Sequence, residues 1–560
     1  MENSKDITFN AQLDELMKKT VSYFNTEYVA RYRDHIESVQ SQQNQENFFS
    51  SINIFSHIDT DGICAAAIMA LALKRENISY QITILKQLNE HNLLKIKSIL
   101  EENNNFSIFL DFGSGQINLL AEYLPNRKYI ILDHHQPLKT EESIPISGFH
   151  ANPYYAGING STGISAAGMS YLFVKKLRAD NADLSHLAII GALGDHQNAG
   201  DARSFIGENK AILEDAKKTM TIKEEVEPFL PRNISLPLGL ANHLPEGINL
   251  FDEDPKKAAY FLKKVGLKYE NDLGHPRFLP DLSSTEKTKL VSALTQKIYT
   301  ENKDKDVPIS KLIRTHYLLT QFKSYPEIHD ATDFSTMLNA TGRLEIPSIG
   351  IACCVNRSNN VIIKGIESSK EYTQKLEDGV SWLINGHKMT SYKGIIAFDG
   401  EDQIPELMVG VVCTILVDNS KIDKSKPIIG YAQSDGDTYK FSARCNEDLI
   451  QKGVNLSQAI RSVSANLGLK DMGGGHPPAA GAFIPKSMIR PFLTQLDEHI
   501  RAQQGEKIDI TQSSSPEMNG SIVVESEVTP NKTKKTSKKS AIEKAPASKK
   551  KTKGLDQWGL

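Results

Sequence analysis

The chain has 560 residues, of which 39% are hydrophobic, and a formal net charge of −3. This length allows two or three domains with at least one sizeable core. No apolar run approaches the roughly 20 residues that cross a bilayer, and the start MENSKDITFN lacks the pattern of a secretion signal. The five cysteines show no CxxC spacing, which argues against structural zinc and a disulfide framework. We therefore expect a cytoplasmic protein without a membrane segment.

The charge is unevenly distributed along the chain. Residues 530–553 contain ten lysines and one acid, which leaves the remainder with a net charge of about −12. An acidic body with a basic tail is not typical of a protein that simply coats nucleic acid. If the body handles a polyanion, local positive groups must offset its carboxylates.

The predicted elements indicate an α/β fold. Residues 1–48 form a polar, helical lead-in. Residues 49–204 alternate short apolar runs (INIFS, FSIFLDFG, KYIILDHH) with helical stretches (GICAAAIMALALKR, GISAAGMSYLFVKKL). This alternation predicts right-handed crossovers and a mostly parallel sheet. In such sheets, functional sites gather at the carboxyl ends of the strands.

The rest of the chain divides into three parts. Residues 205–330 are rich in Lys, Glu and Pro and are predicted to form a helical linking or inserted region. Residues 331–504 are predicted to form a second, smaller α/β domain with strand-like runs IGIACCV, YKGIIAFDG and KPIIGYAQS, closing with MGGGHPPAAGAFIP. Residues 505–560 form a Lys-rich tail that we expect to be disordered, because it has too few apolar residues to offset chain entropy.

Acidic and histidine side chains follow four apolar runs. A lone aspartate such as Asp111 is most often a helix cap or a turn residue, and strand-end histidines often bond only to backbone. Together, however, so many carboxylates at one sheet edge would repel one another unless cations bridge them. Mixed Asp and His groups without cysteine suit Mn²⁺ or Mg²⁺, and their number indicates two ions about 3.5–4 Å apart. The candidates are His57, Asp59, Asp61, Asp111, Asp133, His134, His135 and Asp195, whereas His196 stays ambiguous.

Local geometry refines this prediction. In an extended segment, residues two apart share a face, so Asp59 and Asp61 could point the same way, with His57 beside them. Gly62 would then permit a tight turn into a helix that begins near Ile63.

These motifs resemble those of the DHH phosphoesterase superfamily. HIDTDG, the lone aspartate of LDFG, LDHH and GALGD are similar to its four motifs, and GGGH is similar to the signature of the DHH-associated domain. NPYYAGINGSTGISAAGMSYLF, GALGDHQ and MLNATGRL more narrowly resemble archaeal RecJ-like proteins, including the GINS-associated exonuclease group. The resemblance covers roughly residues 50–490.

The resemblance implies a role for each candidate. Asp59 and Asp61 would bind different ions with His57 alongside, Asp111 would bridge the ions, and His134 and Asp195 would complete the second. Asp133 would orient a neighbour or act as a ligand. His135 would contact the scissile phosphate. The cofactors would be two divalent ions, Mn²⁺ ahead of Mg²⁺.

A second surface is predicted to bind the substrate. The backbone N–H groups of Gly473, Gly474 and Gly475 can approach phosphate closely, and His476 adds a donor. Ser442 and Arg444 lie two apart on one predicted strand, and the resemblance makes them phosphate contacts. A glycine-rich hairpin with a surface arginine is the alternative. Asn339 and Arg343 are secondary candidates, Arg343 being equally compatible with a helix-end ion pair, and Ser161 and Ser165 suit helix caps.

The end of the tail, TKGLDQWGL, places Leu555 and Trp558 three residues apart, on one side of a helical turn. It resembles a degenerate sliding-clamp binding motif, and the alternative is a solvated tail with an apolar end. The preceding lysines would attract DNA.

The function predicted from these motifs is a metal-dependent exonuclease that acts on single-stranded DNA, or RNA, in replication or repair. Two alternatives stay open. One is a phosphodiesterase for short oligonucleotides or small phosphoesters. The other is a non-catalytic replisome scaffold that binds GINS; in an active enzyme, the helical region 205–330 could still dock a GINS-type partner.

Overall fold

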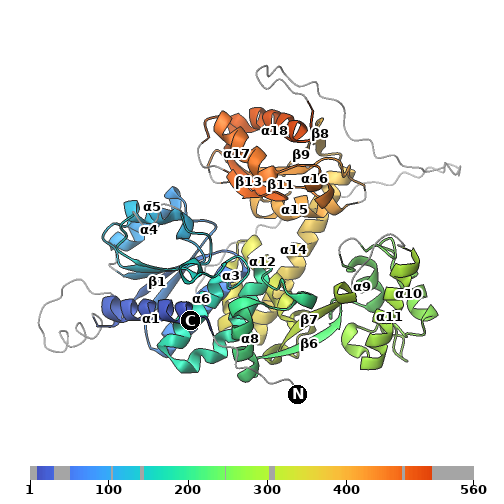
Figure 1. Cartoon of the computed structure of the whole chain (residues 1–560), viewed down its shortest axis with the longest axis horizontal. Helices are drawn as coiled ribbons and strands as arrows, with labels where there is room; N and C mark the ends of the chain where they lie inside the picture. The colour runs from blue at the N-terminus through green and yellow to red at the C-terminus, as the bar shows by residue number, and fades with distance from the viewer. Residues whose placement is uncertain are drawn as a thin grey trace, which may run out of the picture.

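The computed structural model describes residues 9–30, 51–102, 105–138, 144–245, 248–301, 309–419, 421–434, 436–469 and 473–506. These residues form two α/β lobes, and the long helix α14 (Asn359–Asn385) runs from the first lobe to the second (Figure 1). The predicted α/β class with two sheet domains is confirmed. The tail with Leu555 and Trp558 lies outside the described residues.

The first lobe is built on a parallel five-stranded sheet with the order β2-β1-β3-β4-β5. The strands are β1 (Ile52–His57), β2 (Tyr80–Leu85), β3 (Phe106–Leu110), β4 (Tyr129–Leu132) and β5 (Phe149–Ala151). The central strands β1, β3 and β4 are buried on both faces because helices cover the sheet on both sides. All five strands run the same way, so their carboxyl ends meet at one edge.

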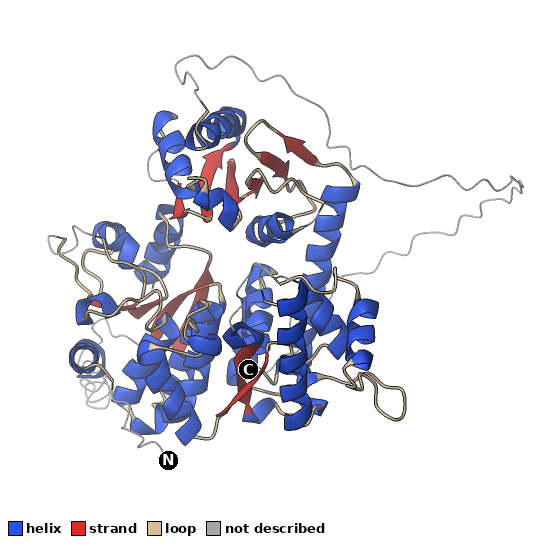
Figure 2. Cartoon of the chain, turned by 45° about the vertical axis from the view of Figure 1, so that its right-hand side comes forward, coloured by secondary structure: helices blue, strands red, loops and turns tan. Residues whose placement is uncertain are grey.

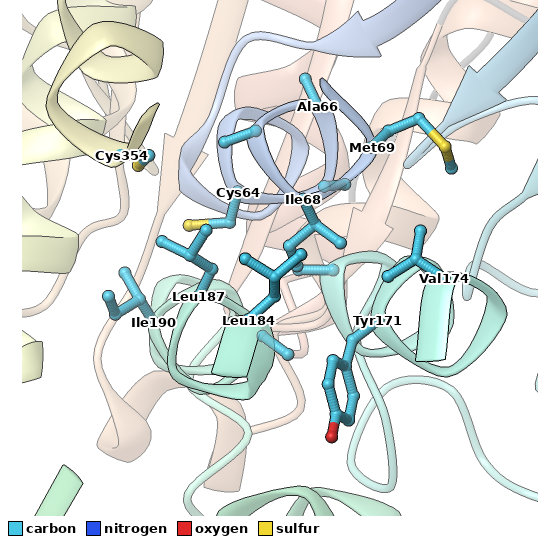
Figure 3. Packing of buried hydrophobic residues seen from close by; sticks show 14 of the residues in the cluster. Cys64, Ala66, Ile68, Met69, Tyr171, Val174, Leu184, Leu187, Ile190 and Cys354 are labelled. Carbon is cyan, nitrogen blue, oxygen red and sulfur yellow. The ribbon is translucent and has the colours of Figure 1, made fainter. Parts of the chain in front are cut away.

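Side chains that alternate along each strand feed two separate cores. Along β3, Ile108 and Leu110 face a large core formed with helices α3 (Thr60–Arg75), α6 (Ala166–Leu177) and α7 (Ser185–Gly194). Phe109 between them faces a smaller core with α4 (Glu90–Glu102) and α5 (Ile117–Tyr123). In Figure 3, Cys64 and Ile68 of α3 point toward residues of α6 and α7 such as Tyr171 and Leu187.

Helices from outside the predicted 49–204 segment complete the large core. The N-terminal helix α1 (Ala11–Phe24) is capped by the Asn10 side chain and buries Leu13, Met17 and Phe24 there. Helix α8 (Gly207–Lys218) adds Ile212. Helices α12 (Ala331–Arg343) and α13 (Pro347–Val355), from the middle of the chain, also pack against it.

The segment between the two lobes contains a helical unit with its own core. Antiparallel strands β6 (Ile222–Pro228) and β7 (Ile313–Leu319) pair along their full length, so the chain leaves the first lobe on one strand and returns on the other. Between them, α9 (Leu236–Asn242), α10 (Pro255–Lys264) and α11 (Ser284–Glu301) bury a separate cluster of mainly leucine side chains. The predicted helices are present, and the strand pair was not predicted (Figure 2).

The second lobe contains a six-stranded mixed sheet with the order β12-β13-β11-β10-β9-β8. Its strands are β8 (Met389–Ser391), β9 (Ile396–Asp399), β10 (Ile428–Gln433), β11 (Thr438–Arg444), β12 (Gly473–His476) and β13 (Ala479–Pro485). Helices α14 and α15 (Glu406–Asp418) cover one face, and α17 (Leu456–Asn466) and α18 (Ile489–Gln503) cover the other. The short helix α16 (Glu447–Gln451) follows β11.

One predicted strand is wrong. The run IGIACCV lies in the helix α13, with Pro347 in its first turn, and Cys353 and Cys354 are buried. A short apolar run has no periodicity that separates a buried strand from a buried helix. Among the described residues, no helix is both long enough and apolar enough to span a bilayer.

Candidate metal centre

The end of β1 supplies the first three side chains of the candidate centre. His57 is the last residue of β1, Asp59 is the N-cap of α3, and Asp61 lies in its first turn. The prediction that Asp59 and Asp61 share one face of an extended segment is wrong, because the helix already begins at Thr60. Gly62 lies inside this turn, where a Cβ would lie only 2.3 Å from the His57 carbonyl oxygen.

Asp111 lies between two histidines at the end of β3. Its Oδ2 is 3.3 Å from His57 Nδ1, and its Oδ1 is 3.4 Å from His134 Nε2. The Asp111 backbone adopts a left-handed φ of 64°, a strained conformation for a residue with a side chain. Each carboxylate oxygen of this buried residue therefore faces a different imidazole.

His134, which follows β4, is surrounded by carboxylates. Its Nε2 lies 3.1 Å from Asp195 Oδ2 and 3.8 Å from Asp61 Oδ2. Asp195 is the C-cap of α7, so it comes from a helix end and not from a strand end. On the other side of Asp111, His57 Nδ1 lies 2.8 Å from Asp59 Oδ2.

Backbone groups fix the orientation of these ligand candidates. His134 Nδ1 lies 2.8 Å from the carbonyl oxygen of Gly160, which can only accept, so Nδ1 carries a proton and Nε2 is the nitrogen that would bind a metal ion. The same carbonyl oxygen accepts from Gln197 Nε2 at 2.8 Å. The carboxylate of Asp61 accepts from the backbone N–H groups of Ala166 and Ala167 at the start of α6, at 2.7 and 3.0 Å.

Asp133 is not among the side chains that could hold a metal ion, and it binds its neighbours instead. Its Oδ1 accepts from the backbone N–H of His134 at 2.8 Å and from His135 Nδ1 at 2.8 Å, and its Oδ2 accepts from Ser114 N–H at 2.9 Å. The His135 side chain is 57% exposed and stands beside the buried acids. Although burial lowers it, the Asp133 carboxylate raises the pKa of His135 to about 9.

Burial and mutual repulsion perturb the carboxylates. Burial raises the pKa of Asp61 well above its usual value, and the nearby Asp195 and Asp111 carboxylates raise it further. Burial also raises the pKa of Asp111. For His134, burial lowers the pKa, but Asp111 and Asp195 outweigh it and raise the pKa well above the usual value. Such a cluster gains from a bound cation.

The arrangement fits two metal ions. Three trios have ligand atoms within 4.8 Å of one another: His57/Asp59/Asp111, Asp61/His134/Asp195 and Asp111/His134/His135. Within the described part of the chain, His57 Nδ1, both Asp111 oxygens and His134 Nε2 are buried without a hydrogen bond of acceptable geometry. Buried polar atoms are rarely left so, and these face one another. Oxygen and imidazole donors without thiolates suit Mn²⁺ or Mg²⁺.

The predicted substrate surface forms a cavity of about 440 Å³ in the second lobe. Ser442 and Arg444 of β11 line it, opposite the glycines of β12. Gln87, which follows β2 of the first lobe, reaches its wall, so the cavity lies where the lobes meet. Exposed His476 is at the end of β12 and is not among its lining residues.

Positive charge gathers around this cavity. Burial lowers the pKa of its lining residue Lys440 to about 8, and the cations Arg343, Lys86 and Arg444 lower it further, whereas Glu406, which forms an ion pair with Lys86, raises it. Lys86 and Lys440 are not among the residues predicted from the sequence. Lys440 stands two residues before Ser442 on β11, so it shares the face of Ser442 and Arg444 and could have been found from the same spacing.

The remaining candidates have structural contacts. Asn339 Oδ1 accepts from Thr60 N–H at 3.2 Å, and Arg343 Nη1 donates to the Leu407 carbonyl at 3.2 Å. Ser165 is the N-cap of α6, as predicted, but Ser161 caps no helix among the described residues.

Comparisons with known proteins place these features in a family. The sequence pattern of the DHH family, N-terminal domain, matches residues 51–194, and that of the DHHA1 domain matches residues 407–502. The uncharacterized protein MJ0831 of Methanocaldococcus jannaschii is 31% identical over 467 residues, which cover 82% of this chain and 95% of that protein. The chain belongs to the DHH/DHHA1 phosphoesterase superfamily.

Solved structures share this fold. CDC45 from Entamoeba histolytica aligns over 88% of this chain and 99% of its own, with a TM-score of 0.52 and 10% identity. RecJ from Thermus thermophilus in complex with Mn²⁺ aligns over 89% of this chain with a TM-score of 0.49 and 13% identity. This chain covers about half (55%) of that RecJ. At 10% identity, the likeness to CDC45 shows the fold alone.

Proposed function

We propose that the chain is a metal-dependent exonuclease that hydrolyses phosphodiester bonds of single-stranded DNA or RNA in replication or repair. The observation that carries this proposal is the position of Asp111, whose two oxygens face His57 and His134 at 3.3 and 3.4 Å. Asp111 belongs to the trio with His57 and Asp59, and its other oxygen faces His134 of the second trio. A carboxylate that can reach both sites is what a pair of divalent ions needs. Mn²⁺ is the first choice and Mg²⁺ the alternative.

The residues around the proposed ions have separate tasks. When bound, two divalent ions polarise a phosphodiester and stabilise the charge of its leaving oxygen. Asp111 would serve both ion sites, and the Gly160 carbonyl holds His134 Nδ1 so that Nε2 would be the nitrogen that binds an ion. Protonated His135, held by Asp133, donates to a phosphate oxygen as negative charge develops there.

The second lobe supports a nucleic-acid substrate. Lys440 and Arg444 present positive charge beside the hydroxyl of Ser442, and the glycine strand β12 leaves its backbone N–H groups approachable. An arginine fork and a backbone edge bind phosphate without reading bases. The acidic body therefore has the local positive surface that a polyanionic substrate requires.

A phosphodiesterase for short oligonucleotides is the second candidate. The volume of about 440 Å³ beside the lobe junction suits one or two nucleotides better than a long segment. Competition between long single strands and di- or trinucleotides separates the two activities. The non-catalytic scaffold is less well supported because the complete His/Asp trios are retained. We keep GINS-type binding by the helical region 205–330, and sliding-clamp binding by the tail, as proposals.

The test is digestion of end-labelled single strands of DNA and of RNA by the full chain with Mn²⁺. We expect progressive shortening from one end, no digestion with EDTA, and no digestion of blunt duplex. Label placement at each end gives the polarity, and the two sugars give the preference. Internal cuts, or cleavage of dinucleotides only, would refute the exonuclease.

A further inference from the structure

A second polar cavity lies beside the candidate metal centre, on the side of the helical unit that lies between β6 and β7 in the sequence. It has a volume of about 240 Å³ and lies between the end of α7, the helix α12 and the strands β6 and β7. Its wall includes His196, which directly follows Asp195. Two arginines, Arg203 and Arg314, line it together with Phe229, and no acidic side chain does.

The two arginines are not neutralised by partners. The guanidinium carbons of Arg203 and Arg314 lie 6.0 and 5.5 Å from the centre of the Phe229 ring. Within the described ranges, neither side chain forms an ion pair; Arg314 Nη2 donates to Thr332 Oγ1 at 3.1 Å, and its buried Nε has no hydrogen-bond partner. An unpaired buried donor of a permanent cation calls for an anion.

The charge of Arg314 lowers the pKa values of Asp330 and Asp333, but within the described residues neither acid forms an ion pair with it. Asp330 binds His316 at 2.5 Å, and burial and the charge of Asp330 raise the pKa of Asp333 to about 8. Glu227, opposite Arg314 in the strand pair, forms an ion pair with Arg232. The positive charge of the cavity is therefore available to a ligand.

The backbone around the cavity is strained. Ala202, Arg203 and His196 have left-handed φ values of 52°, 59° and 55°. Residues with side chains rarely hold this conformation unless the surroundings fix it, and such strain concentrates at functional sites. Two of these strained residues, Arg203 and His196, line the cavity.

Helix α12 connects this cavity to the basic surface of the second lobe. Asn339 lines the cavity, and Arg343, one turn later on the same side of the helix, lowers the pKa of Lys440 by its charge. Asn339 also binds the backbone of Thr60, between the ligand candidates Asp59 and Asp61. One helix therefore has residues next to both positive regions and to the metal centre.

We propose that the Arg203–Arg314 cavity is a second phosphate subsite, which holds a phosphate of the single strand a few nucleotides from the scissile bond. This subsite rests on the proposed function and extends it. The substrate would be a strand long enough to reach from the second-lobe cavity past the metal centre to this cavity. Phe229, over whose ring both guanidinium groups lie, would hold the two arginines together for that phosphate.

The test uses the full chain and oligothymidylates of two and twelve nucleotides, with Ca²⁺ replacing Mn²⁺ to measure binding without cleavage. Arg203→Gln/Arg314→Gln is expected to bind the twelve-nucleotide strand at least about tenfold more weakly. The salt dependence, the slope of log K against log[salt], should fall by about 0.7 for one lost phosphate contact. Cleavage of the dinucleotide with Mn²⁺ should not change.

Three further variants separate charge from folding. Arg203→Lys/Arg314→Lys should keep the salt slope and lose part of the affinity, because lysine keeps the charge without the planar fork. Arg203→Gln alone, at an exposed position, should weaken binding with an unchanged melting temperature. Arg461→Gln, an exposed arginine on α17, is the matched control and should behave like the wild type.

The outcomes are distinguishable. If the wild type binds and cleaves the long strand and the double glutamine variant matches it, the subsite is wrong and the proposed function stands. Equal losses for both lengths would assign the arginines to the metal centre and overturn the subsite. If the wild type binds no strand, the proposed function and the subsite both fall.

Discussion

Asp133 holds the side chain of His135 by its ring and by its backbone at once: Oδ1 lies 2.8 Å from Nδ1 and 3.2 Å from the backbone N–H. These two hydrogen bonds engage Nδ1 and leave Nε2, on the opposite side of the ring, to contact a substrate. They also explain why a buried strand ends in an acid followed by two histidines. The acid supports one histidine, and the other is directed at the carboxylates.

His135→Gln should therefore affect turnover and not metal binding. We expect kcat to fall by about 100-fold or more, as for other donors directed at developing charge, with Mn²⁺ affinity within about threefold of the wild type. Asp133→Asn should lower kcat by a smaller factor, because the ring stays but loses its orientation. Single-turnover cleavage with calorimetric Mn²⁺ titration checks both. A Mn²⁺ affinity that falls with kcat would make His135 a ligand.

Asp111→Asn should abolish the dinuclear centre. We expect Mn²⁺-dependent cleavage to fall by several orders of magnitude and calorimetry to record at most one ion, because the trio with His57 and Asp59 loses a charged oxygen and the trio Asp61/His134/Asp195 stays intact. Without metal, the variant should melt at a higher temperature than the wild type, since a buried repelling charge is gone. Asp180→Asn, an exposed surface change, is the control. Two ions bound by Asp111→Asn would contradict the bridging role.

Arg444→Ala should weaken substrate binding more than it slows the chemical step. Arg444 lines the second-lobe cavity and is not among the metal-ligand trios, so its charge acts on the bound strand. We expect KM for a single strand to rise about tenfold or more, with kcat changed by less than about threefold. Steady-state kinetics at two salt concentrations measures this. An equal effect on both parameters would place Arg444 in the transition state.

Much of the fold and of the site was predictable because of one topological fact. In a parallel sheet, the residues that follow β1, β3 and β4 must meet at one edge, so HIDTD, LD and LDHH converge whatever the loops do. Asp195 could not be placed this way, since it follows a helix. Its preceding run, IIGALG, is apolar throughout and has no period that would mark it as α7.

The supporting residues were beyond local patterns. The Gly160 carbonyl reaches His134 from a loop 26 residues away, and Gln197 joins it from beyond α7. Arg203 lies in the short turn Asp201–Arg203 and Arg314 lies on β7, and the two meet only at the ring of Phe229 in the folded chain. Nothing in their sequence neighbourhoods distinguishes them from surface arginines. Motifs place residues at the ends of elements, whereas tertiary packing decides which loops support them.

Asp333 gives a pH dependence that is separate from the metal centre. Its folded-state pKa is about 8, against an ordinary value of 3.8, so the folded chain holds a proton that the unfolded chain releases. This contribution to stability is complete below about pH 3.8 and is lost as the pH rises through about 8. Asp333→Asn should remove this loss. The free energy of unfolding of the variant, relative to that of the wild type, should therefore be higher near pH 8.5 than near pH 6. Urea unfolding at the two pH values tests this, and an equal difference at both would contradict it.

Gly160→Ala should loosen the metal centre although it replaces none of the ligand candidates. A Cβ at Gly160 would lie 1.9 Å from the His134 carbonyl oxygen, so the loop has to move and withdraw the carbonyl that fixes the His134 ring. Loss of such a supporting hydrogen bond typically weakens metal binding by about 10- to 100-fold. Gly115→Ala is the matched control, because a Cβ there meets no atom within 4 Å. Calorimetric Mn²⁺ titration of both variants is the measurement. Wild-type Mn²⁺ affinity in Gly160→Ala would show that the ring needs no support from this loop.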